Sequence, residues 1–213
     1  MPWREHDTDI LIDPTLNREG DEYKNLVPGH TKLLCGVKYA PLRSEFYKAR
    51  QKKPDSIIRI ETRKHILVSL GLTDPDNITS VVLKGLLKVQ KDVDVTVLMS
   101  PQSTFEQEIE SLVSQFKFNA QILHSQSDMA GLLSRCDLVI GAGGSSSWER
   151  CCLGVPALQL ILADNQKDVT ESLEKTGAIQ SLGFLRDFSP EIVTKSVDSI
   201  LVDDQNLKAM SEA

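Results

Sequence analysis

Apolar and polar residues follow two alternating patterns along most of this chain. From residue 65 onward, short continuous apolar runs alternate with longer segments in which apolar residues recur every three or four positions. The runs predict buried strands at residues 65–70, 93–99, 120–124, 137–140, 157–162 and 178–182. The segments between them predict helices at residues 77–90, 103–116, 127–135, 145–154 and 165–176, with a closing helix from Pro190. This alternation predicts an α/β fold with a doubly wound parallel, Rossmann-like sheet.

The first 54 residues lack this regularity. Residues 9–13 and 32–36 could each form a strand, but a polar stretch without helical period separates them. Residues 45–53 predict a charged helix that ends in a linker. Because this region cannot bury a core of its own, we expect residues 1–54 to be the remnant of an N-terminal domain plus a linker. Residues 55–213 then form the Rossmann-like domain.

Charge and cysteine content exclude several classes of function. The net charge is −6 at pH 7 and no cluster of Lys and Arg interrupts the acidic balance, which argues against nucleic acid and anionic membranes as partners. No apolar stretch approaches the roughly 20 residues of a membrane span. The four cysteines lack metal-ligand spacing. We therefore expect a cytoplasmic protein without a metal site or a cofactor.

The segment DLVIGAGGSSSWERCCLGVP, residues 137–156, carries the strongest chemical signal. A buried strand runs into the glycine turn Gly141–Gly144, where the backbone can approach a ligand closely. Ser145–Ser147 then open a helix, so that hydroxyls and free N–H groups face the same way, as in a phosphate site. Glu149 lies just inside that helix, where its carboxylate could accept hydrogen bonds from a diol. From these residues alone, an ordinary strand–turn–helix connection that binds nothing is an equal alternative.

Other polar turns are predicted at the same edge of the sheet. Residues 71–77, 125–129 and 163–166 each follow a predicted strand, and ligands of doubly wound sheets bind beyond the carboxyl ends of the strands. The turns are compatible with one shared site, or with ordinary helix caps. Of the four histidines, His124 ends a predicted strand at this edge, and we expect it to pack or cap rather than to catalyse.

Taken together, these segments resemble a known family. GAGGSSSWERCCLGVPAL followed by ADNQ resembles the signature of the pseudaminic acid pathway UDP-sugar hydrolases, UDP-2,4-diacetamido-2,4,6-trideoxy-β-L-altropyranose hydrolases, whose broader group includes spore-coat polysaccharide biosynthesis proteins. VSLGLTDPDNIT, SDMAGLLSRCDLVIGAGG and KYAPLRSEF add to the resemblance, which spans almost the whole chain. The chain is more distantly similar to the UDP-GlcNAc-binding half of MurG-type N-acetylglucosaminyltransferases.

The resemblance implies the C-terminal half of a GT-B-like fold, in which two Rossmann-type domains face a cleft and this half binds UDP. It also implies roles for individual residues. The diphosphate would be held by Gly143, Gly144, Ser145 and Ser146, and the ribose hydroxyls by Glu149. Met129 and Ala130 would lie near the base and the α-phosphate, and Asn165 and Gln166 would reach the pyrophosphate or the sugar.

Two departures from the family pattern limit what the resemblance implies. Leu72 stands where family members usually carry a second glycine, which puts a ligand role of that loop in doubt. The glycine-rich turn with a histidine that serves as the family's catalytic base is not found in this sequence. We therefore identify no catalytic residue here and expect the base in an N-terminal domain, either of the same protein or of a separate partner. We also expect the family's final helix to be lacking.

The implied function is that of a UDP-sugar hydrolase, releasing UDP from an amino-deoxy sugar nucleotide in bacterial nonulosonic (pseudaminic) acid or surface-polysaccharide biosynthesis. This chain would supply the half that binds UDP or a UDP-sugar, with little or no turnover alone. Two alternatives stay open: the donor-binding domain of a MurG-like glycosyltransferase, and a non-catalytic UDP-binding module.

Overall fold

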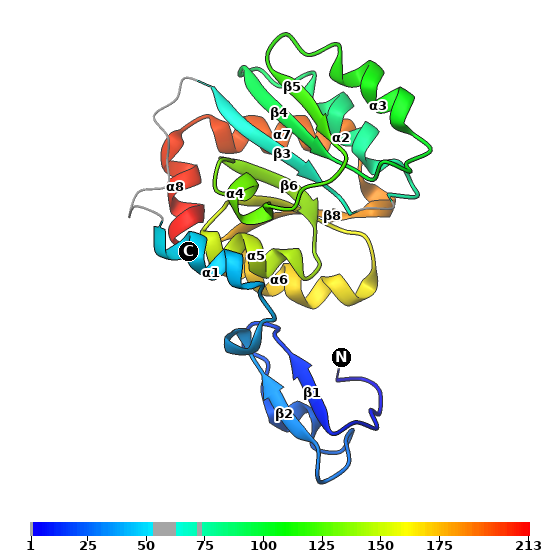
Figure 1. Ribbon diagram of the computed structural model, residues 1–213, viewed down its shortest axis with the longest axis vertical. Coiled ribbons are helices and arrows are strands. Elements are labelled where there is room, and N and C mark those ends of the chain that lie inside the picture. The colour runs from blue at the N-terminus through cyan, green and yellow to red at the C-terminus, as the bar shows by residue number, and fades with distance from the viewer. Residues whose placement is uncertain (1, 53–62, 72–73) are drawn as a thin grey trace.

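The main sheet consists of six parallel strands. The computed structural model describes residues 2–52, 63–71 and 74–213. The order of the strands is β5-β4-β3-β6-β7-β8, and every neighbouring pair is parallel (Figure 1). Their bounds are β3 Lys64–Ser69, β4 Val93–Leu98, β5 Ala120–Leu123, β6 Leu138–Ala142, β7 Ala157–Ile161 and β8 Ile179–Phe184. The predicted parallel sheet is confirmed.

The chain winds in two directions from the middle of this sheet. It runs from β3 outward to β4 and β5, then crosses back to β6 beside β3 and continues outward to β7 and β8. The helices are α1 Ser44–Lys52, α2 Ile78–Leu86, α3 Glu106–Val113, α4 Met129–Leu133, α5 Ser146–Leu153, α6 Lys167–Thr176, α7 Pro190–Leu201 and α8 Asp204–Glu212. The winding direction reverses between β3 and β6, where Ser69 lies opposite Gly141, and ligands of such sheets bind at this switch point.

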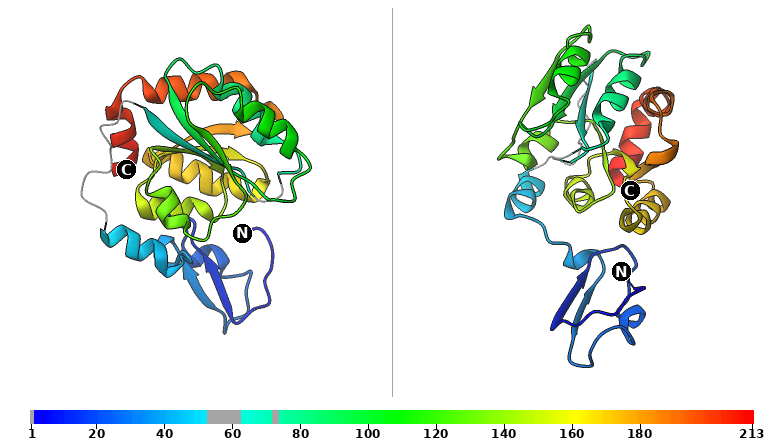
Figure 2. Two further views of the ribbon diagram at one scale, coloured as in Figure 1. Left: turned by 45° about the horizontal axis from the view of Figure 1, so that its top comes forward. Right: turned by 90° about the vertical axis from the view of Figure 1, so that its right-hand side faces the viewer.

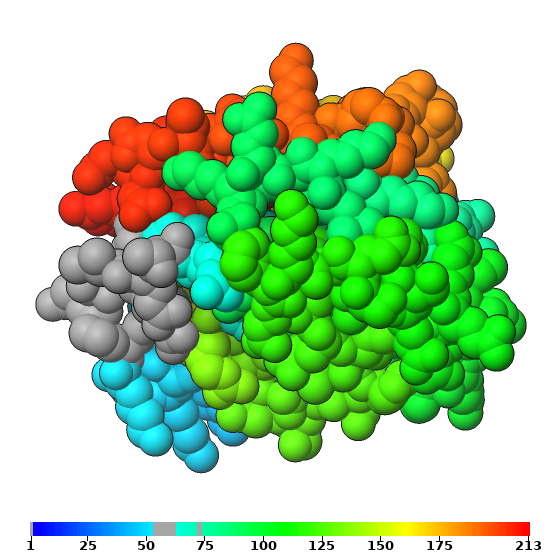
Figure 3. Space-filling view, turned by 90° about the horizontal axis from the view of Figure 1, so that it is seen from above, coloured from blue at the N-terminus to red at the C-terminus, as the bar shows by residue number. Residues whose placement is uncertain are grey.

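Alternate residues of the central strands face two separate helix layers. Ile66 and Val68 pack into a core shared with α2, α3, α7 and α8, whereas Leu67 faces a core shared with α1, α4, α5 and α6. Figure 3 shows the molecule from above, with α7 and α8 of the first layer, in orange and red, beside the green of α2. Burial on both faces explains why these strands read as continuous apolar runs.

A small unit precedes the large domain. Its two strands, β1 (Ile10–Asp13) and β2 (Lys32–Cys35), lie where strands were predicted, and they form a separate parallel pair, which was not predicted. 3-10 turns lie at Gly20–Tyr23 and Val37–Tyr39. Figure 2 shows this unit, in blue, beyond the layer that holds α1, α5 and α6. An ion pair of 3.1 Å between Arg18 and Asp168 of α6 joins the two parts.

Polar side chains hold the interior of the small unit together. The buried phenol of Tyr23 donates to Asp13 Oδ2 at 2.6 Å, and Arg18 Nε lies 2.9 Å from the same oxygen. Burial alone would raise the pKa of Asp13, but hydrogen bonds from Thr15 and Tyr23 and the charge of Arg18 outweigh it and lower that pKa. The carboxylate therefore takes the place of apolar packing at the centre of a unit with few core residues.

Some boundaries differ from the prediction. The helix expected from residue 165 begins with a 3-10 turn, Asp164–Gln166, before α6 starts at Lys167. A further helix, α8, was not predicted; Asp203 begins it by accepting a hydrogen bond from the N–H of Gln205. Leu72 and most of the expected linker lie outside the described residues. Within the described part, no helix combines the length and the apolar composition needed to cross a membrane.

Candidate functional site

The N-terminus of α5 presents free backbone donors at the switch point. After β6, the N–H of Gly143 donates to Leu160, and the first bond into the helix runs from Ser147 to Gly144. No side chain in the described part of the chain caps this helix. The three N–H groups in between, those of Gly144, Ser145 and Ser146, have no acceptor within the described parts of the chain. Such groups, at the positive end of a helix dipole, suit an anion.

The neighbouring helix α2 does not offer the same opportunity. It also begins at the switch point, after β3, but the carboxylate of Asp74 accepts hydrogen bonds from the N–H groups of Ile78 (2.8 Å) and Thr79 (2.9 Å). The helix therefore carries its own anion at its N-terminus, and a second negative group there would be repelled. Of the two helices that start at the switch point, α5 is the one with open donors.

The two glycines of the α5 turn serve different purposes. A Cβ atom on Gly143 would lie 2.3 Å from Thr170 Oγ1 and 3.0 Å from Gln159 Nε2, so this glycine is required by packing. A Cβ atom on Gly144 would meet nothing within 4 Å. Gly144 therefore borders open space, as expected of a residue that a ligand approaches. Gly143, in contrast, must be glycine because neighbouring side chains leave no room for a Cβ atom.

A buried arginine, Arg150, donates hydrogen bonds to residues of this turn from the protein interior. Arg150, only 3% exposed, donates from Nη1 to Ser146 Oγ and from Nη2 to Ala142 O, Ser147 Oγ and Gln159 Oε1, all within 3.0 Å. Its Nε has no hydrogen-bond partner among the residues that the structure describes. Burial lowers the pKa of the guanidinium to about 10, so the group is a cation at neutral pH. It lies among neutral oxygen atoms.

The three serines differ in what they can offer a ligand. The expectation that all three hydroxyls face outward is wrong for Ser147, which is buried and donates to Gln159 Oε1 at 3.0 Å. A polar side chain in the middle of the apolar strand β7 requires this partner. Ser146 is half-buried against Arg150, and Ser145 is exposed. Ser145 and Ser146 therefore remain available.

Glu149 occupies a different side of α5 from the buried network. Its carboxylate lies 3.4 Å from Nη2 of Arg43, which also stacks over the ring of Phe46 in α1 at 5.1 Å. The side chain of Glu149 is 21% exposed. It is therefore partly accessible and already paired with a cation.

The remaining residues implied by the resemblance come from two turns at the same edge. Met129 and Ala130 begin α4, which packs beside α5; Met129 is half-buried and Ala130 is buried. Gln166 lies beside Gly143 and accepts the N–H of Leu162 at 2.9 Å. Both residues belong to the 3-10 turn Asp164–Gln166; the structure brings Gln166 to the α5 turn and leaves Asn165 exposed.

The histidines of the large domain have structural partners. His124 directly follows β5 at the same edge, where its Nε2 lies 3.2 Å from Glu106. His65 lies at the opposite end of the sheet, as predicted, with its ring nitrogens near Arg135 O and Thr96 Oγ1. Neither lies in the α5 turn.

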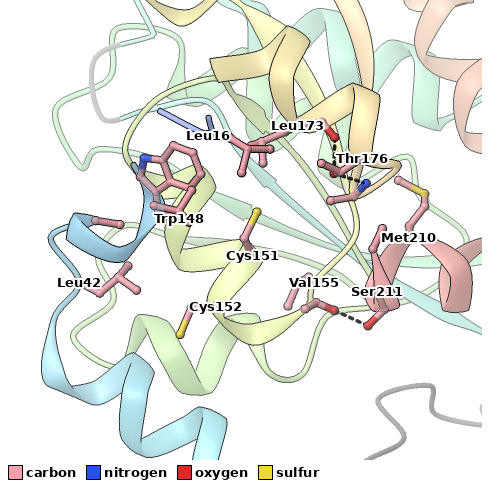
Figure 4. A pocket seen from close by; sticks show the side chains of 15 residues that line it. Leu16, Leu42, Trp148, Cys151, Cys152, Val155, Leu173, Thr176, Met210 and Ser211 are labelled. Carbon is pink, nitrogen blue, oxygen red and sulfur yellow. Dashed lines mark hydrogen bonds between the residues drawn. The ribbon is translucent and has the colours of Figure 1, made fainter. Parts of the chain in front are cut away.

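A separate cavity of about 410 Å³ lies at the other end of α5 (Figure 4). Its lining is mostly apolar and includes Leu16, Trp148, Cys151, Leu173 and Met210. Burial raises the pKa of the Cys151 thiol, so it stays protonated at neutral pH. An apolar hollow at the negative end of the helix dipole does not suit a phosphate, and this cavity is not the anion site.

Two residues of the turn's support were missed by sequence reasoning. Gln159 is fully buried in the middle of β7, and Arg150 is nearly so. The signal for Gln159 was present, because a lone amide inside the apolar run ALQLI needs hydrogen-bond partners. Arg150 follows Ser146 by four residues, which places both on one helix face. The burial of Arg150 could not be read from the sequence.

Comparison with known proteins places the chain in a family. A match to the family described as "Protein of unknown function (DUF354)" covers residues 47–171. The "Uncharacterized protein MJ1062" of Methanocaldococcus jannaschii is 32% identical, over 75% of this chain and 34% of its own length. The "Spore coat polysaccharide biosynthesis protein SpsG" of Bacillus subtilis is 31% identical, over 74% of this chain and 45% of its own length.

More distant similarity extends to one hydrolase and to glycosyltransferase structures. The "UDP-2,4-diacetamido-2,4,6-trideoxy-beta-L-altropyranose hydrolase" of Campylobacter jejuni is 23% identical, over 81% of this chain and 59% of its own length. The crystal structure of Acinetobacter baumannii MurG matches with a TM-score of 0.61 at 19% identity, over 88% of this chain and 52% of that one. The rhamnosyltransferase SpnG complexed with thymidine diphosphate matches with a TM-score of 0.55 at 22% identity, over 75% of this chain and 42% of that one.

These matches establish two points. The fold is the Rossmann-like fold of GT-B glycosyltransferases. The chain spans about a third to three-fifths of the length of the curated relatives that it matches. On the match over residues 47–171, the chain belongs to the DUF354 family, with distant homology to the spore-coat polysaccharide biosynthesis protein SpsG.

Proposed function

We propose that this chain binds the diphosphate of UDP or a UDP-sugar at the N-terminus of α5, as the nucleotide-binding half of a UDP-sugar hydrolase. The observation that carries the proposal is the contrast between two helices at the switch point. The first N–H groups of α5 lack acceptors among the described residues, whereas those of α2 are taken by Asp74. An anion that enters this edge of the sheet is thereby directed to α5.

The residues around α5 can be assigned to parts of the nucleotide. Gly144, Ser145 and Ser146 hold the diphosphate, with Gly143 setting the shape of the turn. Glu149 accepts hydrogen bonds from the ribose hydroxyls, for which it must exchange its contact with Arg43. The base and the α-phosphate lie near Met129 and Ala130 at the start of α4. Asn165 and Gln166 reach the pyrophosphate or the sugar.

In the hydrolysis reaction, water attacks the anomeric carbon of the sugar and the bond to the diphosphate oxygen breaks. Negative charge then develops on the departing UDP. Donors that already point at the diphosphate stabilise this charge in the transition state. The chain thus contributes leaving-group stabilisation, and the base that activates water belongs to an N-terminal catalytic half, in the same protein or in a partner.

The relatives support a role in polysaccharide or nucleotide-sugar metabolism. SpsG is named as a spore coat polysaccharide biosynthesis protein, and the Campylobacter relative as a UDP-sugar hydrolase. SpnG was crystallised with a nucleoside diphosphate on a fold of the same type. These names favour an enzyme of amino-deoxy sugar nucleotides, in nonulosonic (pseudaminic) acid or surface-polysaccharide biosynthesis. The cytoplasmic location is part of the proposal and rests on the cysteine pattern of the sequence.

Calorimetry and an activity assay test the proposal. Titration of the chain with UDP is expected to release heat and to saturate at one site, with UMP binding more weakly. The UDP-sugar of the Campylobacter enzyme should bind as well but be hydrolysed slowly or not at all by this chain alone. Absence of heat at millimolar UDP would overturn the binding proposal, and rapid turnover would overturn the assignment of the base to another segment.

A glycosyltransferase donor domain is the second candidate, favoured by the structural similarity to MurG and SpnG. Both reactions use the same leaving group, and they differ in whether water or a sugar acceptor attacks. Analysis of the products with and without acceptor, using the longer protein, separates transfer from hydrolysis. A non-catalytic UDP-binding module would give binding without turnover in either assay.

A further inference from the structure

Among the described residues, Arg150 forms no ion pair, and the carboxylate whose charge reaches it, that of Glu149, is itself paired with Arg43. The side chain of Arg150 is 3% exposed. Its four hydrogen bonds end on neutral oxygens, and its Nε makes none. A buried cation is costly to hold without an anion nearby. The free N–H groups of the same turn mark where such an anion would lie.

Arg150 also determines what Ser146 can do. A guanidinium carries only donors, so Ser146 Oγ accepts the bond from Nη1 at 3.0 Å. The hydroxyl hydrogen of Ser146 is then left to donate elsewhere. Ser147 differs, because it donates to Gln159 while it accepts from Arg150. Ser146 therefore keeps a hydroxyl hydrogen for a ligand, as the exposed Ser145 does, whereas Ser147 does not.

We propose that Arg150 is a positioning residue for a diphosphate: it fixes Ser146 as a donor to the ligand, and its buried charge favours the ligand with more negative charge. The proposal rests on the proposed function, since it concerns the same site. On this proposal, Arg150, which is buried behind the turn, causes the site to prefer a nucleoside diphosphate over a monophosphate. Arg150 itself need not touch the ligand.

The readout is the ratio of the affinities for UDP and UMP, measured by calorimetry. The wild-type chain is expected to prefer UDP, and Arg150→Met should weaken UDP binding at least tenfold while weakening UMP binding much less. Arg150→Lys keeps the charge and should retain most of the preference. Arg186→Met is the matched control, because the side chain of Arg186 is 77% exposed and contacts only its close neighbours Asp187 and Phe184 in the described structure.

Ser146→Ala provides a second, independent variant, which leaves the guanidinium in place. It should also lower the ratio of the affinities for UDP and UMP. The double variant with Arg150→Met should lose less UDP binding free energy than the sum of the losses in the two single variants. If Arg150→Met fails to fold, as judged by circular dichroism, Ser146→Ala and Arg150→Lys carry the test.

The outcomes separate this inference from the proposed function. If the wild-type chain binds neither nucleotide, the proposed function fails. If the wild-type chain prefers UDP and the variants keep that preference, or lose UDP and UMP equally, the positioning role of Arg150 is wrong although the site stands. A selective loss of UDP, rescued in part by lysine, supports the inference.

Discussion

The phenol of Tyr23 donates a 2.6 Å hydrogen bond to the carboxylate of Asp13, at the centre of the small N-terminal unit. Both side chains are buried, and Arg18 completes the group by bridging Asp13 and Asp168 of α6. A charged group thus connects the interior of the small unit to the surface of the large domain. The stability of that connection depends on the ionisation of one carboxylate.

Tyr23→Phe tests this dependence. The pKa of Asp13 is below its ordinary value of 3.8, so its contribution to stability is present above about pH 3.8 and lost as the pH falls through the lowered value. Without the phenol, the free energy of unfolding at pH 7 should fall by about 1–3 kcal/mol. The difference in the free energy of unfolding between the wild-type chain and the variant should become smaller in acid. Denaturant unfolding at several pH values measures it, with Tyr47→Phe, whose side chain is exposed, as control.

Gly143→Ala and Gly144→Ala form a matched pair in the α5 turn. The added methyl group at residue 143 would meet Thr170 and Gln159, and should cost about 1–3 kcal/mol of stability. The methyl group at residue 144 would enter open space, so the melting temperature should hardly change. If the diphosphate lies there, UDP binding should nevertheless weaken. Thermal melts and calorimetry together distinguish the two effects; equal melting temperatures would contradict the packing explanation for Gly143.

Glu149→Gln tests the assignment of the ribose contact. The carboxylate should accept stronger hydrogen bonds from the ribose hydroxyls than an amide does, so UDP affinity should fall roughly tenfold, about 1.4 kcal/mol. Stability should change little, because a partly exposed ion pair contributes less than about 1 kcal/mol. Glu45→Gln is the control, since Glu45 lies 3.3 Å from the same arginine, Arg43. Equal affinities of both variants for UDP would exclude the ribose role.

Gln159→Leu should destabilise the large domain without touching its surface. Gln159 accepts hydrogen bonds from Arg150 and Ser147 and donates to Thr170 at 2.8 Å. Leucine would leave these buried groups short of partners, at a cost of about 2–3 kcal/mol. Gln180→Leu, in the neighbouring strand, removes only a contact with Ser196 and should cost less. Denaturant unfolding measures the stability of both variants. If Gln159→Leu lost less stability than Gln180→Leu, the structural importance of the hydrogen bonds of Gln159 would be contradicted.

The sheet was predictable because its strands are apolar on both faces, and the connections between them are short. The edge of the sheet that carries the candidate site followed from the same pattern, because the carboxyl ends of parallel strands lie at one edge. The strand order that places the switch point between β3 and β6 was not predicted. What each residue does there was less predictable. Ser145, Ser146 and Ser147 are three identical residues in a row. They differ in burial and in whether Arg150 or Gln159 contacts them. Helix α8 was missed because its sequence, DQNLKAMSE, has a single buried residue, Leu207.

The isolated pair of strands β1 and β2 has a consequence for the behaviour of the molecule in solution. Among the described residues each strand pairs on one side only, and Ile10 and Ile12 are more than half exposed. Unpaired strand edges beside apolar side chains are templates for strand addition between molecules. The net charge of −6 opposes such encounters, and salt screens that repulsion. The colloidal stability of the whole chain is therefore governed by its smallest folded part and by the ionic strength around it.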